Sequence, residues 1–184
     1  TEVSPGSAEP HLMISARKAA LGDLEGSLAA ADAAITAEPG SERARLRKAE
    51  ILIDLSHRDK KPEQMQEASE ILTAILKEKP DLPEALFVRG KLELSRNEIT
   101  AAIDTLRRAI DAKPNWAQAH FLLGSALILN GERPRARAEL ARSVELDSNI
   151  IEARRLLTQI HAQLGEHEYA IEQGRIYLKA NPKA

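Results

Sequence analysis

The chain has 184 residues, of which 26 are Lys or Arg and 28 are Asp or Glu, so its formal net charge is -2. A nearly neutral chain argues against a nucleic-acid-binding protein, which normally carries a net basic charge. The absence of cysteine excludes disulfides, thiolate metal ligands and a cysteine nucleophile. Hydrophobic residues make up 43% of the chain and aromatic residues only 3%, a composition that favours helices over strands.

A spacing of 34 residues organises the chain. Small residues recur at this spacing: Gly90 and Gly124, Gly131 and Gly165, Ala85, Ala119 and Ala153, and Ala102, Ala136 and Ala170. The phase predicts a flexible lead-in over residues 1–7 and five units over residues 8–41, 42–82, 83–116, 117–150 and 151–184. Between Pro39 and Pro80 the interval is 41 residues, which predicts a seven-residue insertion in the second unit.

Each unit contains two segments with helical apolar periodicity and a turn between them. In the first unit Gly22 marks the turn. In the second unit the turn has no glycine, and we expect the insertion, near residues 57–63, to lengthen this turn as a loop. The third unit keeps the small residues Gly90 and Ala102 at the expected helix crossing. Units one to three are therefore expected to form helix hairpins.

The last two units follow the same plan. In the fourth unit the helical segments Ala117–Leu129 and Arg135–Glu145 flank Asn130 and Gly131, a pair that favours a left-handed turn. In the fifth unit Gly165 marks the turn, but Gly174 stands where the other units have a bulky residue. A lone hairpin cannot bury its apolar side, so the five units are expected to stack.

This pattern resembles the tetratricopeptide repeat (TPR) family. The fourth unit carries the best match to the family consensus, with Leu123, Gly124, Leu127, Ala136 and Leu140. The resemblance covers residues 8–184 and implies an all-α fold, a right-handed α-α superhelix of five helix hairpins. It also implies non-catalytic protein–protein interaction through the concave face of the superhelix.

In this family the first helix of each hairpin lines the inner groove. By phase, we expect the partner-binding groove to include apolar, polar and basic side chains from all five units: Leu12, Arg43, Leu46, Arg47, Phe87, Lys91, Leu94, Phe121, Ser125, Ile128, Arg155 and Gln159. Phe87 and Phe121 are one period apart and are expected to stack along the groove. Such a groove suits an apolar or amphipathic polypeptide, bound as a helix or as an extended segment.

No enzyme signature accompanies the repeats. The nearest metal-like cluster is His161, Glu166, His167 and Glu168, which we interpret as a solvated turn because its ligands do not converge from a rigid frame. His57 and Asp59 have no nucleophile or oxyanion donor beside them. We therefore predict no catalytic residue, no metal and no cofactor.

The partners expected are proteins or peptides, with no nucleic acid and no direct membrane insertion. The last unit is expected to leave an uncapped apolar edge of Ile171, Ile176, Tyr177 and Leu178, which leads to two interpretations. Either the natural protein continues past this chain, or the chain self-associates through its C-terminal repeat.

The composition resembles that of bacterial TPR proteins, of which some serve export or envelope assembly. The compartment stays open between the bacterial periplasm or envelope and the cytoplasm. One alternative function is a regulatory or substrate-docking module of a larger enzyme. Another is a structural spacer that assembles through its open end.

Overall fold

The computed structural model describes residues 7–180. The predicted lead-in over residues 1–7 therefore lies outside the described residues except for Ser7. Within residues 7–180 the secondary structure is helical and contains no strand. The helices are α1 (Glu9–Ala20), α2 (Leu24–Ala37), α3 (Glu42–Asp59), α4 (Pro62–Glu78), α5 (Pro83–Ser95), α6 (Ile99–Ala112), α7 (Ala117–Leu129), α8 (Arg133–Leu146), α9 (Ile151–Gln163) and α10 (His167–Ala180). The predicted all-α fold of five consecutive helix pairs is confirmed.

Short turns join the two helices of each pair, and each contains a residue with positive φ. Gly22, Gly131 and Gly165 occupy this conformation in the first, fourth and fifth pairs, at φ values of 78°, 81° and 77°. Lys60 (φ 58°) and Asn97 (φ 61°) replace glycine in the second and third pairs. A left-handed residue after the last helical turn satisfies free carbonyl groups there. The turn geometry is thus kept even where the glycine is missing.

The seven-residue insertion lengthens two helices, so the predicted loop was wrong. Helix α3 has 18 residues and α4 has 17, whereas α5, α7 and α9 have 13 and α6 and α8 have 14. Residues 57–59 form the last turn of α3, and Pro62 begins α4. Proline is tolerated at the first position of a helix because it needs no N–H there. Only Lys60 and Lys61 remain between the helices.

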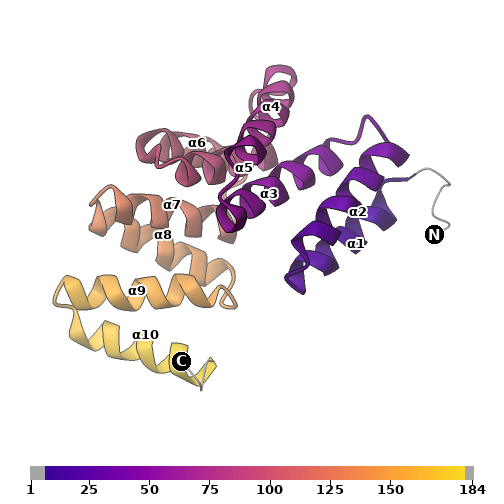
Figure 1. The fold of residues 1–184 in the computed structure, drawn as a ribbon. Helices are drawn as coiled ribbons and strands as arrows, with labels where there is room; N and C mark the ends of the chain where they lie inside the picture. The colour runs from indigo at the N-terminus through magenta and orange to yellow at the C-terminus, as the bar shows by residue number, and fades with distance from the viewer. Residues whose placement is uncertain (1–6, 181–184) are drawn as a thin grey trace. The chain divides into compact units, whose positions relative to one another are not determined.

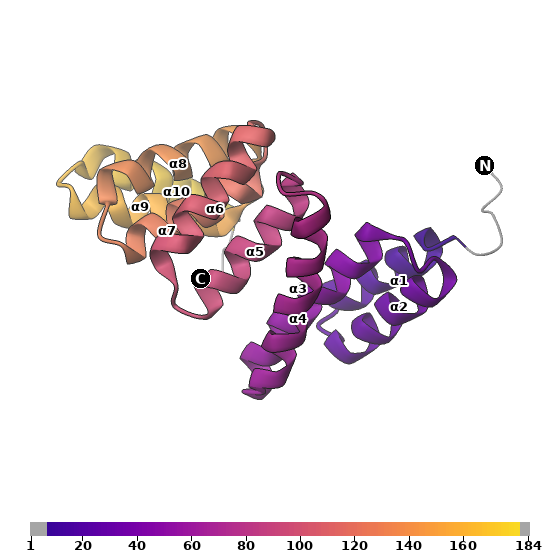
Figure 2. The same ribbon diagram turned by 90° about the horizontal axis from the view of Figure 1, so that it is seen from above.

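The chain divides into two compact units, one ending at Arg96 and the other beginning at Asn97. In the first unit α1 packs on α2, α2 on α3, α3 on α4, and α5 on both α3 and α4 (Figure 1). In the second unit α6 packs on α7, α7 on α8, α8 on α9, and α9 on α10 (Figure 2). The division falls within the third helix pair, so that α5 belongs to the first unit and α6 to the second.

Small residues let the two helices of a pair approach closely. A Cβ atom added to Gly124 on α7 would lie 2.7 Å from Cγ of Leu140 on α8, well inside van der Waals contact. In the last pair the sizes are reversed, because Thr158 on α9 faces Gly174 on α10, where the added Cβ would lie 3.5 Å from the threonine methyl. The unusual Gly174 therefore makes room for Thr158.

Candidate functional site

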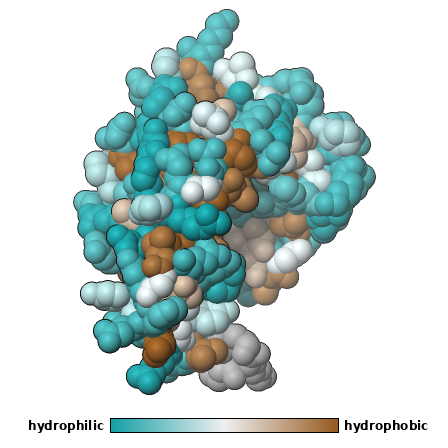
Figure 3. Space-filling model, turned by 90° about the vertical axis from the view of Figure 1, so that its left-hand side faces the viewer, coloured by the Kyte–Doolittle hydropathy of each residue, from teal (hydrophilic) through white to brown (hydrophobic). Residues whose placement is uncertain are grey.

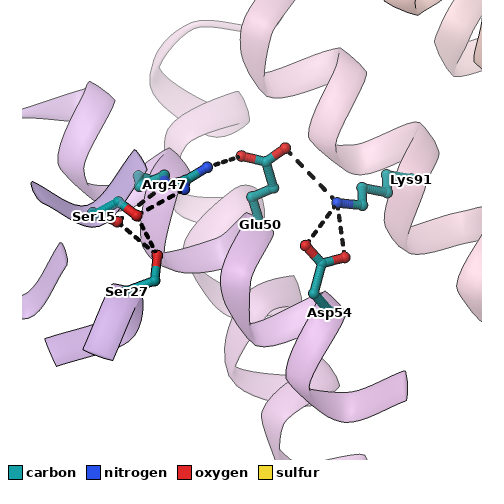
Figure 4. Close-up of polar contacts among 6 residues, drawn as sticks. All are labelled: Ser15, Ser27, Arg47, Glu50, Asp54 and Lys91. Carbon is teal, nitrogen blue, oxygen red and sulfur yellow. Dashed lines mark hydrogen bonds and ion pairs between the residues drawn. The ribbon is translucent and has the colours of Figure 1, made fainter. Parts of the chain in front are cut away.

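The candidate site is the face of the first helices of the hairpins, here called the first-helix face, on which the predicted groove residues were placed. In the first unit this face contains a chain of polar contacts across α1, α2, α3 and α5 (Figure 4). Arg47, Glu50 and Asp54 lie on one side of α3 because they are three or four residues apart. Lys91 reaches them from α5.

Lys91 joins the two carboxylates of α3. Its Nζ atom lies 2.9 Å from Oδ1 of Asp54 and 3.7 Å from Oε1 of Glu50. Glu50 also accepts a hydrogen bond from Nη1 of Arg47 at 3.0 Å. Two cations and two carboxylates therefore balance one another within the network.

Two buried serines anchor the other end of Arg47. Its Nε donates to Oγ of Ser15 at 3.1 Å, and its Nη2 donates to the Ser15 carbonyl oxygen at 3.3 Å. The Ser27 hydroxyl donates to the same carbonyl oxygen at 2.8 Å, and both serines are fully buried. By phase, Ser15 and Ser27 hold the places that Gly124 and Ala136 hold in the fourth unit, so a hydroxyl pair replaces a purely apolar crossing.

The other predicted groove residues of α1 and α3 are mostly engaged within the fold. Leu12 is partly buried against Ala34 and Ala44. Arg43 is exposed and pairs with Glu9 at 2.5 Å. Leu46 does not line an open groove, since it is only 7% exposed and packs in the core of the first unit. In the first compact unit the first-helix face is thus more polar than predicted, and most of its side chains contact one another or the core.

Phe87 and Leu94 on α5 are both partly buried. Phe87 packs against the core cluster that includes Leu46, Leu52 and Val88. Phe121 belongs to the other unit, so the expected stacking of Phe87 on Phe121 stays a prediction.

In the second compact unit, which begins at Asn97, the first-helix face is closer to the predicted mixture of apolar and polar side chains. Phe121, Ser125 and Ile128 follow one another at helical spacing along α7, and all three are partly exposed. The Ser125 hydroxyl donates to the Phe121 carbonyl oxygen at 2.9 Å and is therefore satisfied within its own helix. On α9, Arg155 and Gln159 are exposed, with Arg155 paired to Glu152 at 2.6 Å. This part of the face offers apolar side chains together with accessible polar groups.

The histidine–glutamate cluster near the last turn is occupied by internal contacts. Oε2 of Glu166 lies 2.6 Å from Nδ1 of His161, and Arg137 forms an ion pair with the same carboxylate. The Arg137 hydrogen bond, followed by that from His161, lowers the pKa of Glu166 below its usual value. The His161 ring also stacks on Tyr169, with centroids 5.5 Å apart. Among residues 7–180 no three potential ligands come together to hold a metal ion.

The second chemical candidate, His57 with Asp59, is not formed as a pair. His57 Nε2 lies 2.8 Å from the Ser95 hydroxyl on α5. Asp59 instead accepts from Arg58, whose hydrogen bond lowers the pKa of that carboxyl. These contacts tie α3 to α5 and order the end of α3.

Sequence reasoning missed Ser15, Ser27 and Asp54 as members of the polar network. The spacing of Glu50 and Asp54, four residues apart on one helix, was the available signal, together with a lysine on the following first helix.

None of the helices within the described range is both long enough and apolar enough to span a membrane.

The chain is similar in fold to solved bacterial structures. TTC0263, a thermophilic TPR protein of Thermus thermophilus, matches with a TM-score of 0.80 at 20% identity, over 96% of this chain and 93% of that one. MamA from Desulfovibrio magneticus RS-1 matches with a TM-score of 0.66 at 21% identity, over 94% and 93%. YrrB, a TPR protein with an unusual peptide-binding site, matches with a TM-score of 0.62 at 19% identity, over 97% and 88%.

A comparison with curated proteins found no match. The family model described as tetratricopeptide repeat matches residues 63–117 and 121–184, well over half of the chain. With its five helix pairs and its 34-residue period, the chain belongs to the tetratricopeptide repeat family, whose members are protein–protein interaction scaffolds.

Proposed function

We propose that this protein is a non-catalytic scaffold that binds an apolar or amphipathic polypeptide segment on the first-helix face of its second compact unit, which begins at Asn97. The observation that carries the proposal is the row of Phe121, Ser125 and Ile128 on α7, which stays partly exposed. Partly exposed aromatic and aliphatic side chains at helical spacing are the anchors that helix-in-groove and extended-peptide recognition use.

Polar groups on the next first helix support the same proposal. Arg155 and Gln159, which follow Phe121 and Ser125 by one period, are exposed on α9 and supply donors and an acceptor. Arg155 pairs with Glu152 on its own helix, and an ion pair between two exposed side chains contributes little to stability. A partner carboxylate or carbonyl group therefore competes for Arg155 at little cost to the fold.

The first compact unit, which ends at Arg96, contributes less to binding in this proposal. Its cations Arg47 and Lys91 are already neutralised by Glu50 and Asp54. Phe87, Lys91 and Leu94 remain predicted contacts of the first unit, to be tested separately. We also propose a bacterial setting in export or envelope assembly. The absence of cysteine is compatible with an oxidising compartment, and the similar structures named above come from bacteria where their source is given.

Panning of the intact chain against a displayed library of short peptides tests the proposal. We expect the selected peptides to be rich in apolar side chains, and Phe121→Ala to weaken their binding by about 30-fold, the equivalent of an aromatic anchor of about 2 kcal/mol. Ser125→Arg should block the same face without removing a buried side chain. Leu129→Ala, at an exposed site at the end of α7, is the matched control and should bind like the wild type.

Circular dichroism of each variant separates loss of binding from loss of fold. Wild-type binding by a folded Ser125→Arg variant would reject the proposed face. Loss of helicity in Phe121→Ala alone would assign that ring to the core.

A further inference from the structure

Large apolar side chains are exposed mainly at the two terminal helices of the repeat array. Within residues 7–180 they comprise Met13, Ile14 and Leu21 at α1, Leu164, Tyr169, Ile171, Ile176 and Leu178 at the last pair, and Leu129 at the end of α7. Figure 3 shows hydrophobic side chains at the surface at the lower end of the view, where the last pair lies. Single exposed apolar residues are ordinary on a protein surface, but a concentration of them marks an interaction site.

The seventh residue of a 34-residue unit contacts the preceding hairpin in the second unit, whereas in the third unit Arg89 pairs with Glu93 on its own helix. Lys48 is the seventh residue of the second unit, and its Nζ lies 2.9 Å from Oδ1 of Asp32 on α2. In the fourth and fifth units this place is taken by Leu123 and Leu157, each 3% exposed. Ile14 is the corresponding residue of the first unit and is 47% exposed. Ile14 is therefore exposed at a position that is buried in the fourth and fifth units.

The twenty-first residue of the fourth unit contacts the following hairpin. Arg137 holds this place in the fourth unit and pairs with Glu166 of the following hairpin. Ile103 holds it in the third unit and is 3% exposed. Ile171 is its counterpart on α10 and is 55% exposed. The face of α10 that carries Ile171 thus exposes an apolar side chain at a position that is buried in the third unit.

We propose that a second copy of this chain covers α10 with its own α1, so that copies associate head to tail. The contact continues the interface by which α2 packs on α3 and α8 packs on α9 within the chain. Helix α1 is a first helix with an apolar seventh residue, as are the first helices of the fourth and fifth units. A net charge of only -2 opposes the approach of two copies weakly.

The proposed contact joins two different surfaces and is independent of the peptide-binding face. A heterologous contact of this kind builds rings or open chains of subunits. It also makes a specific prediction about mixtures, because a copy that is blocked at α1 still carries an intact α10, and a copy blocked at α10 still carries an intact α1.

Light scattering coupled to size-exclusion chromatography on the full chain tests the proposal. We expect the wild-type mass to rise above the 20.2 kDa of one chain as the concentration increases. Ile14→Glu and Ile171→Glu should each remain at 20.2 kDa, and an equimolar mixture of the two should form a complex of twice that mass and no larger. Leu129→Glu, an equally surface-exposed change away from both terminal helices, should associate like the wild type.

Three results would overturn the proposal. A wild-type chain that stays at the mass of one chain at every concentration does not self-associate. Association of Ile14→Glu at wild-type strength would mean that α10 packs on something other than α1, such as a second α10. A mixture of the two folded variants that stays monomeric would show that the two surfaces do not fit each other.

Discussion

A single added methyl group should destabilise the hairpin in which Gly124 contacts Leu140, but not the hairpin that contains Gly174. The Cβ of Gly124→Ala would lie 2.7 Å from Cγ and 3.0 Å from Cδ2 of Leu140, where ordinary contacts between carbons are about 3.5–4.0 Å. Leu140 is fully buried, and closely packed neighbours resist the displacement of a buried side chain. Overpacking of this kind costs about 1–3 kcal/mol. The better helix propensity of alanine offsets roughly 1 kcal/mol of that cost.

Gly174→Ala is the matched control, since it makes the same chemical change within a helix of the next pair. Its new methyl would lie 3.5 Å from Thr158, which is a normal contact, so only the helix propensity should act and the variant should be neutral or slightly more stable. The helix-propensity gain is common to both variants. Their difference in the free energy of unfolding therefore isolates the clash, about 1–3 kcal/mol. Urea unfolding of the full chain, followed by circular dichroism at 222 nm, measures it. A Gly124→Ala variant as stable as Gly174→Ala would refute the packing argument.

Three other predictions concern a buried hydroxyl, a helix-capping carboxylate and an ion pair. Ser143 is fully buried and its hydroxyl has no hydrogen-bond partner among residues 7–180, so Ser143→Ala should raise the free energy of unfolding by about 1 kcal/mol, seen as a higher thermal midpoint. The Gly26 amide, with Lys18, lowers the pKa of Asp23. The stabilisation that these contacts give the fold is complete above the ordinary pKa of a carboxyl group and is lost as the pH falls through the lowered pKa. Asp23→Asn should weaken this pH dependence of the free energy of unfolding, measured by denaturant titrations at several pH values. A double-mutant cycle on Lys91→Ala and Asp54→Ala should give a coupling energy of up to about 1 kcal/mol, and a value of zero would remove the pair from the stabilising contacts.

Much of the fold follows from periodicity, because the hairpin is a local structure and its repeats share one set of contacts. The Asn130–Gly131 turn and the two helices around it lie where the pattern placed them, within a residue or two. The second and third turns were harder to predict because Lys60 and Asn97 adopt a conformation that glycine usually supplies. Asparagine adopts this conformation more readily than most residues, whereas the residue type of Lys60 gives no indication of it.

The candidate site was less predictable than the fold. Helical phase indicates the direction of a side chain from its own helix, but not whether a neighbouring helix covers it. Leu46 was placed on the groove and lies instead in the core. Lys91 was placed on the first-helix face without its partner Asp54, which lies 37 residues away, four residues off the 41-residue interval between the second and third units. Long charged side chains reach across such offsets, so their pairing depends on three-dimensional packing.

The lengthened α3–α4 hairpin also has a practical consequence. The five residues by which α3 exceeds α5 amount to about 7.5 Å of extra helix. The hairpin ends in two exposed lysines, Lys60 and Lys61, away from the network of Arg47 and Lys91. A fluorophore, affinity handle or surface tether attached at this tip should leave both proposed binding surfaces untouched, which gives the experiments above a common point of immobilisation.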